Sequence, residues 1–138
     1  MNKYSFGKTS KARRDTCCKI GRVILDEAIE TFTLFDFGIV CGHRCEEDQN
    51  KEFIEGDSKA KWGDSGHNVM KGNKPYSIAW DVAPYCPKLR DYLWDDVEKF
   101  KQLYEHFRLI GLKHGVTIIW GGNFKSIKND NCHHEIVI

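Results

Sequence analysis

The sequence predicts an α+β domain in which helices flank a small, mostly antiparallel sheet. Two segments, 11–33 and 93–114, carry apolar residues with the period of an amphipathic helix. Short apolar runs bounded by glycine, proline and polar residues lie between and after them, which is typical of strands. Helices and short strands in this order indicate a single sheet of short strands.

Each remaining element has its own local pattern. After the helix at 11–33, the run "FDFGIVCG" at 35–42 predicts a buried strand that ends at its glycine. A short helix is predicted at 46–53, within a polar segment that is otherwise a loop. Further strands are expected at 78–83, 116–120 and 133–138.

The helix at 93–114 has the clearest stripe of apolar residues. An aspartate near its start, around Asp91 or Asp95, is expected to cap it, because a carboxylate accepts hydrogen bonds from free backbone N–H groups. Gly115 suits its C-terminal end.

Length and charge exclude several classes of protein. The chain has 138 residues, which fits one domain over 1–138. Its 21 basic and 20 acidic residues leave a net charge of +1, so neither nucleic acid nor a membrane surface is an expected partner. No apolar run approaches the roughly 18 residues of a transmembrane helix, and no signal peptide is visible in the first 30 residues. We expect a monomer.

The basic stretch "KTSKARR" at 8–14 is interpreted as a solvated helix start, with attraction to an anionic polymer as the alternative.

The chain contains six cysteines. Without a secretory context we expect reduced thiols, most of them buried, rather than a disulfide framework. A structural zinc site built from Cys41, Cys45 and "CHH" at 132–134 is the alternative.

Strand alternation places two polar groups on one side of the sheet. In "IAWDVAP", Trp80 and Val82 would face the helices while Asp81 faces the other side. In the last strand, His134, Ile136 and Ile138 would form the core face. His133, Glu135 and Val137 would share the opposite face.

A buried carboxylate such as Asp81 needs a cation nearby, either an arginine or lysine or a metal ion. His67, Asp81 and His133 would supply two imidazoles and one carboxylate, a set that suits zinc with one position left for water. Asp130, three residues before His133, could then act as a general acid and base.

The motifs "SGH…SIAWD" and "DNCHHE" resemble the SxH(x)nD…DxxHxE pattern of zinc-dependent D-alanyl-D-alanine peptidases and of phage L-alanyl-D-glutamate endolysins. "FGKTS" at 6–10, "GHR" at 42–44, Gln49, "DVAPY" at 81–85 and "WGGNF" at 120–124 resemble stretches of the phage group in the same order. The resemblance covers nearly the whole chain. It implies the fold shared by lysostaphin-type, D-Ala-D-Ala and hedgehog-like (LAS) metallopeptidases.

Roles follow from the resemblance position by position. His67, Asp81 and His133 match the zinc ligands, and Asp130 matches the catalytic acid and base. Arg44 matches an arginine that contacts substrate or stabilises the oxyanion; a salt bridge to Glu46, Glu47 or Asp48 is its alternative. Glu135 is expected to orient a ligand, and Trp120 to belong to the core or the wall of the site.

Two departures from the pattern stand out. Thirteen residues separate His67 from Asp81, more than the family usually has, so "NVMKGNKP" at 68–75 resembles an insertion that could alter the mouth of the cleft. His134 beside His133 creates a choice of ligand, and the DxxH spacing and strand parity favour His133.

The resemblance implies a zinc metallopeptidase that hydrolyses an amide in the peptide stem of peptidoglycan. The phage-like motifs favour an endolysin that cuts between L-alanine and D-glutamate, made in the host cytoplasm and reaching the wall through a holin pore. It would have no separate wall-binding domain. A D,D- or L,D-carboxypeptidase with the same zinc centre is the first alternative, and a non-catalytic, zinc-stabilised wall-binding module is the second.

Overall fold

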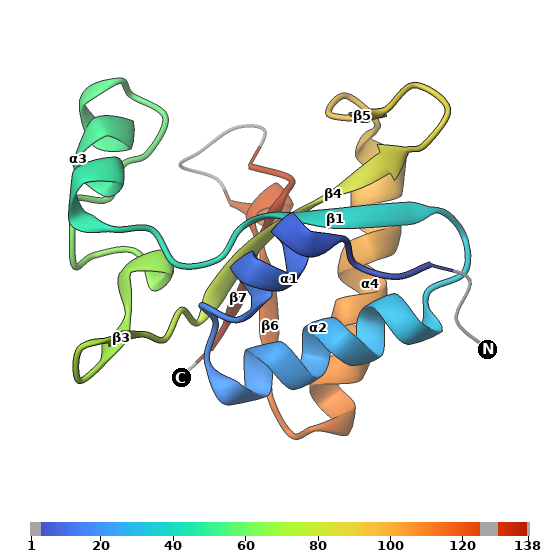
Figure 1. The fold of residues 1–138 in the computed structure, drawn as a ribbon, viewed down its shortest axis with the longest axis horizontal. Helices are drawn as coiled ribbons and strands as arrows, with labels where there is room; N and C mark the ends of the chain where they lie inside the picture. The colour runs from blue at the N-terminus through green and yellow to red at the C-terminus, as the bar shows by residue number, and fades with distance from the viewer. Residues whose placement is uncertain (1–3, 125–129, 138) are drawn as a thin grey trace.

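The computed structural model describes residues 4–124 and 130–137. Its centre is an antiparallel sheet with strand order β1-β4-β7-β6, and β5 pairs with the far end of β4 (Figure 1). The strands of this sheet are β1 (Asp36–Cys41), β4 (Ala79–Cys86), β5 (Asp91–Tyr92), β6 (Ile118–Trp120) and β7 (His133–Ile136). The helices are α1 (Lys8–Arg14), α2 (Lys19–Thr31), α3 (Glu46–Ile54) and α4 (Val97–Lys113), with short 3-10 helices η1 (Gly66–Asn68) and η2 (Gly121–Asn123). The predicted α+β class is confirmed.

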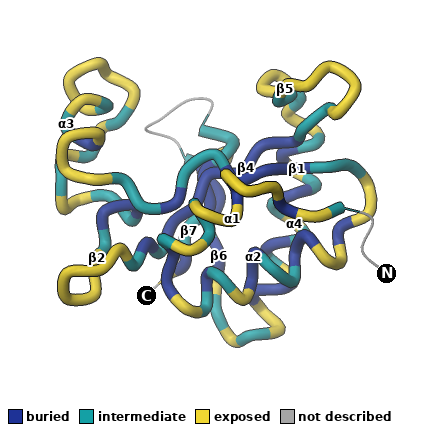
Figure 2. Tube along the Cα trace, in the orientation of Figure 1, coloured by how far each residue is buried: buried dark blue, intermediate teal, exposed yellow. Residues whose placement is uncertain are grey.

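Helices α2 and α4 cover one face of the sheet, and the main core lies between them and the strands (Figures 1 and 2). Trp80 and Val82 of β4 and Ile136 of β7 all belong to this core, as strand parity predicts. Asp81 points to the other side, into a polar cleft. Ile138, expected on the core face, lies outside the described residues.

Residue Asp81 occupies the middle of a row that crosses three strands. It lies opposite Cys41 of β1 and opposite His133 of β7. A β-bulge between Ile39 and Cys41 makes this row possible, because it shifts the alternation of β1 by one residue. Ile39 therefore faces the core, while Cys41 shares the cleft side with Asp81.

The single helix predicted at 11–33 is wrong, because α1 and α2 are separate helices. The chain extends at Cys18, whose backbone N–H donates to the Ser77 carbonyl at 2.8 Å, and the Ser77 N–H donates to the Thr16 carbonyl at 3.0 Å. Pairing with this distant segment interrupts a helix that the apolar periodicity alone would continue.

Other boundaries differ by a few residues. Helix α4 begins four residues later than predicted, and its cap is Asp96, not Asp91 or Asp95; the Asp96 carboxylate accepts a hydrogen bond from the Lys99 N–H at 3.2 Å. Gly115, with φ +77°, follows its end as expected. Strand β4 is longer than 78–83 because its last residues pair with β5.

The segment 68–75 is not an irregular loop. Met70–Lys71 (β2) and Lys74–Pro75 (β3) pair as a small exposed hairpin, whose turn contains Gly72 at φ +61° (Figure 2). Over the described part of the chain, no helix is long and apolar enough to cross a membrane.

Candidate metal centre and active site

Three side chains converge at the centre of the cleft floor. His67 Nε2 lies 3.2 Å from Asp81 Oδ1 and 3.1 Å from His133 Nδ1, and His133 Nδ1 lies 3.3 Å from Asp81 Oδ1. Strand pairing brings Asp81 and His133 together, and η1 places His67 above them. The structure thus assembles the three residues that the sequence singled out as ligands.

Hydrogen bonds on the far side of each ring fix which nitrogen faces this point. The Gly42 carbonyl lies 2.6 Å from His67 Nδ1 and can only accept, so Nδ1 carries a proton and Nε2 is directed at Asp81. The Glu135 carboxylate lies 3.1 Å from His133 Nε2 and leaves Nδ1 to face the other ligand atoms. Glu135 therefore has the orienting contact expected of it.

Gly66 has no side chain, and this allows the Glu135 carboxylate to approach η1 closely. A Cβ atom at Gly66 would displace the Glu135 carboxylate, so glycine at this position lets Glu135 keep its contact with His133. Ser65 accepts a hydrogen bond from the His67 N–H at 3.2 Å and caps the same short helix.

Burial and charge act against each other at the three side chains. Burial alone would raise the pKa of Asp81, but His67 and His133 hold it well below its usual range. Burial would lower the pKa of each histidine; contact with Asp81 instead raises the pKa of His67 well above 6.5 and that of His133 to about 9. The cluster therefore favours positive charge beside the carboxylate.

The triangle of donor atoms has the size that a metal ion requires. Three ligand atoms about 2.0 Å from a tetrahedral zinc ion lie roughly 3.3 Å from one another. The three distances among His67, Asp81 and His133 fall within 0.2 Å of that value, and two imidazoles with one carboxylate suit zinc.

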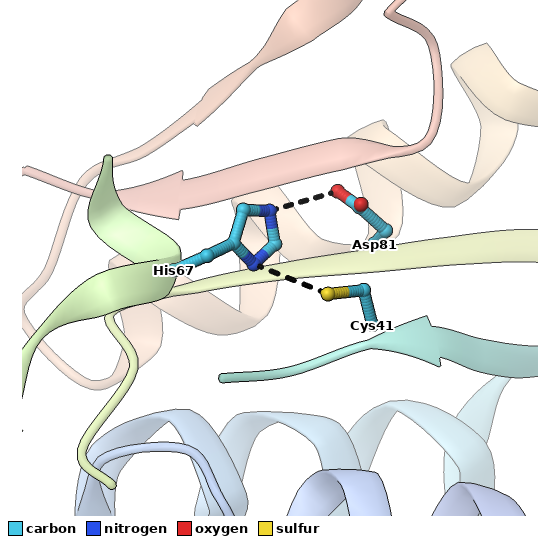
Figure 3. Close-up of side chains that lie close together, drawn as sticks. All are labelled: Cys41, His67 and Asp81. Carbon is cyan, nitrogen blue, oxygen red and sulfur yellow. Dashed lines mark hydrogen bonds and ion pairs between the residues drawn. The ribbon is translucent and has the colours of Figure 1, made fainter. Parts of the chain in front are cut away.

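Cys41, His67 and Asp81 also form a group close enough to hold a metal ion (Figure 3). Cys41 Sγ, however, lies 3.8 Å from His67 Nδ1, whereas Asp81 contacts Nε2 of the same ring. Figure 3 shows the two partners at different ring nitrogens. Because Nδ1 already donates to Gly42, the geometry favours the Nε2 side, where His133 is the third residue.

The alternative structural zinc site is not assembled in the described residues. Cys45 is exposed and does not belong to the group of possible ligands that contains Cys41. All six cysteines are free thiols, but only Cys17 and Cys18 are fully buried, so the expectation of mostly buried thiols is wrong.

His134, the competing histidine, is fully buried on the core face. Its ring packs 4.9 Å from Phe107, and its Nδ1 bonds the Cys132 carbonyl at 3.0 Å. Burial lowers the pKa of His134 to about 3. This side chain is a neutral core residue and cannot reach the cleft.

Arg44 faces the same centre. Its Nη2 lies 3.7 Å from Asp81 Oδ2, and its Nη1 donates to Gln49 Oε1 at 3.1 Å. Within the described segments it makes no ion pair with any carboxylate other than Asp81, so the alternative bridge to the acidic start of α3 is absent. Arg44 supplies one of the cations that a buried Asp81 requires.

A buried amide network holds Arg44 in place. Gln49 is completely buried, and its Oε1 accepts from both Arg44 and Asn68 Nδ2, each at 3.1 Å. Its Nε2 donates to the Ala60 carbonyl at 2.6 Å and to Ser58 Oγ at 3.1 Å. One side chain thus connects α3, the arginine, η1 and the 58–60 segment of the cleft wall.

The cleft has a volume of about 360 Å³. The three candidate ligands, Arg44, Asp130 and Glu135 line it, together with 57–60, 64–66 and Phe124. Burial raises the pKa of Asp130, which favours a carboxyl that can hold a proton. None of the residues 68–75 lines the cleft, and an effect of this segment on its mouth stays a prediction.

Trp120 is a core residue, the first of its two expected places, and it does not line the cleft. Its ring stacks on Tyr104 at a centroid distance of 5.3 Å, and its Nε1 donates to the Asn131 carbonyl at 2.6 Å. This bond supports the turn that leads into His133.

Sequence reasoning missed two residues of the site. Cys41 was considered only for a structural site, because the bulge that turns it towards Asp81 leaves no pattern in the sequence. Gln49 was named only within the resemblance, and its contact with Arg44 was not predicted. The short spacing of five residues between the two was the one sign of that contact in the sequence.

Two imidazoles and a carboxylate on the floor of a polar cleft, beside an arginine and a carboxyl of raised pKa, are the groups that a metal-dependent hydrolase uses. A family model of the phage L-alanyl-D-glutamate peptidase matches residues 2–137, so the chain belongs to that family. It is a peptidase and a peptidoglycan hydrolase.

A solved structure agrees with this fold. The crystal structure of the Serratia marcescens L-Ala D-Glu endopeptidase ChiX is similar over 98% of this chain and 92% of its own, with a TM-score of 0.78 and 18% sequence identity. This likeness confirms the fold expected from the motifs. No curated protein matches the chain in a direct sequence comparison.

Proposed function

We propose that the chain is a zinc endopeptidase that cuts the bond between L-alanine and D-glutamate in the peptidoglycan stem, as a phage endolysin. The convergence of His67 Nε2, Asp81 Oδ1 and His133 Nδ1 within 3.3 Å of one another carries the proposal. Family membership over 2–137 supports the bond assignment.

His67, Asp81 and His133 would hold the zinc ion. When bound there, zinc would polarise the scissile carbonyl and lower the pKa of water towards 7. Any proton on His67 Nε2 and on His133 Nδ1 must leave first, because a protonated nitrogen has no lone pair for a metal. The bonds to Gly42 and Glu135 keep the correct ring nitrogen directed inward throughout.

Asp130 would move the proton. It takes a proton from the attacking water and delivers it to the amine of the departing D-glutamate residue. Its position on the cleft wall and its raised pKa suit both halves of that task. Arg44 would donate hydrogen bonds to the oxyanion that develops on the L-alanine carbonyl, held in place by Gln49.

The test compares Asp130→Asn with the parent protein on purified cell walls, with zinc content and folding measured on both. The variant should stay folded and zinc-loaded while its rate falls by about a hundredfold to ten-thousandfold. Chelation of the parent should abolish turbidity loss, and zinc should restore it. Lysis that persists after complete zinc removal would contradict the proposal.

The bond is assigned by mass spectrometry of the digested wall. New N-terminal D-glutamate is the expected product. Free D-alanine without it would instead identify a carboxypeptidase with the same zinc centre. An Asp130→Asn variant with unchanged effect on the wall would favour a non-catalytic wall-binding module.

We also propose that the enzyme works as a monomer, accumulates in the host cytoplasm and reaches the wall through a holin pore. Induced alone in a bacterial host, it should leave the culture turbid. Addition of a pore-forming holin should produce lysis, and lysis at the same rate without a pore would exclude this route.

A further inference from the structure

A second hollow lies between the β2–β3 hairpin and the junction of α1 and α2. Its volume is about 610 Å³. The residues that give it its chemistry are Asp15, Thr16, Arg22, Lys71, Lys74 and Tyr76. None of them lines the catalytic cleft, so the two sites are separate.

The segments that form this hollow concentrate the positive charge of the chain. Residues 8–22 and 69–76 contain eight lysines and arginines and one acidic residue, a net charge of +7, whereas the whole chain carries +1. Arg14 already pairs with Asp15 and with Asp26, at 2.9 and 3.1 Å. The three cations of the hollow itself, Arg22, Lys71 and Lys74, form no ion pair with any described carboxylate.

The hairpin holds two of these cations close to each other. Lys71 and Lys74 are a directly opposed pair of the β2–β3 ladder, on either side of a two-residue turn. Like charges at opposed positions destabilise a hairpin. Lys71 Nζ instead lies 5.2 Å from the centre of the Tyr76 ring, which forms part of the same hollow. An anion between the two ammonium groups would relieve their repulsion.

The hairpin is fixed against the body of the protein. Tyr76 N–H donates to the Val69 carbonyl at 2.9 Å and closes its base. Ser77, the next residue, bonds Thr16 and Cys18 at the α1–α2 junction. The hollow is therefore a formed feature of the fold, and the backbone that carries Lys71 and Lys74 is in place before any ligand arrives.

We propose that this basic hollow binds carboxylates of the peptidoglycan stems that neighbour the stem in the cleft. The inference rests on the proposed function, since the polymer that occupies the cleft presents further stems with free carboxylates along its length. A second contact on the same polymer raises the effective concentration of the substrate at the cleft. The hairpin is thus a holding site for the wall rather than part of the cleft.

The test uses binding and cleavage separately. Lys71→Gln/Lys74→Gln is compared with Lys88→Gln/Lys101→Gln, which removes the same charge from exposed positions elsewhere. Binding to intact wall sacculi is measured by co-sedimentation in the Asp130→Asn background at low salt. The hairpin variant should bind about tenfold more weakly, and the control pair should bind like the parent.

Cleavage of a short soluble stem peptide, measured with Asp130 intact, should be unchanged in both double variants. Cleavage of the short peptide reports the proposed function alone. A loss of peptide cleavage can therefore be told apart from a loss of wall binding at the holding site. Equal binding by the hairpin variant and the parent would overturn the inference.

Two treatments of the wall identify the anion. Capping the stem carboxylates as amides should abolish the difference between the hairpin variant and the parent. Removing phosphate-containing wall polymers should leave that difference intact. If phosphate removal abolishes it instead, the hollow binds wall phosphates and the carboxylate assignment is wrong.

Discussion

The β4–β7 pair carries one buried histidine on each face, and the pKa values of these two histidines shift in opposite directions. On the cleft face, His133 lies opposite Asp81, and its pKa rises to about 9. On the core face, His134 lies opposite Trp80, and its pKa falls to about 3. Both imidazoles are buried, 9% and 0% exposed, so burial does not distinguish them.

The difference lies in what each ring faces. His133 has carboxylates at both nitrogens, Asp81 at 3.3 Å and Glu135 at 3.1 Å. His134 has Phe107 beside it, and its Nε2 has no hydrogen-bond partner among the described atoms. Neighbouring groups, placed by strand alternation, put one histidine in the charged cluster of the cleft and the next in the core.

The largest effect should separate these two histidines. His133→Ala removes a donor atom, so metal content should collapse and wall hydrolysis should fall by at least about a thousandfold, with the fold retained. His134→Ala leaves a cavity, so urea unfolding should show a loss of about 2–4 kcal/mol with metal and activity retained. The comparison fails if His134→Ala is the variant that loses the metal.

Acid should destabilise the protein through His134. An unfolded histidine titrates near 6.5, whereas the folded pKa is about 3. Between these values the unfolded chain binds a proton that the folded protein does not, so stability falls as the pH falls.

Metal-free wild type and metal-free His134→Leu should therefore diverge on going from pH 7 to pH 4. The wild type should lose about 3 kcal/mol more than the variant, measured by urea unfolding at each pH. Parallel pH profiles would show that His134 is not neutral in the folded protein. Working without metal keeps the titration of His133 common to both proteins.

The smallest effect should come from Glu135, which contacts the outer nitrogen of His133 and not the donor atoms of the cluster. Glu135→Gln keeps the shape of the side chain but weakens its hold on His133 Nε2. Zinc affinity should fall by about tenfold to a hundredfold, measured by competition with a chelator. The matched change Glu98→Gln, on the exposed start of α4, should have no effect. Equal affinities for parent and Glu135→Gln would show that Gly66 and β7 alone position the ring.

Strand parity could be predicted because alternation is a local property. It placed Trp80 and Val82 in the core, and it chose His133 over His134 for the cleft face. Whether Asp81 lies opposite His133 could not follow from parity, since it depends on the register between strands about fifty residues apart. Ligand chemistry suggested that grouping, and the resemblance to a known family supported it.

The prediction of secondary structure failed where pairing with another segment of the chain overrode the local sequence pattern. Ser77 interrupts the helical stripe between α1 and α2, and the bulge after Ile39 reverses the parity that Cys41 would otherwise have. The segment 68–75, singled out as an addition to the loop, folds as the β2–β3 hairpin. Its place beside α1 and α2, away from the cleft, depends on contacts that no periodicity encodes.

Helix α3 has one buried residue, and that residue is Gln49. Most helices remain docked through an apolar stripe, whereas this one depends on an amide that water can replace. We therefore expect α3 to open as a unit of its own, at lower denaturant than the core around α2 and α4. Each such opening would release Arg44 and the 58–60 wall together, so the working lifetime of the enzyme would end before the protein as a whole unfolds.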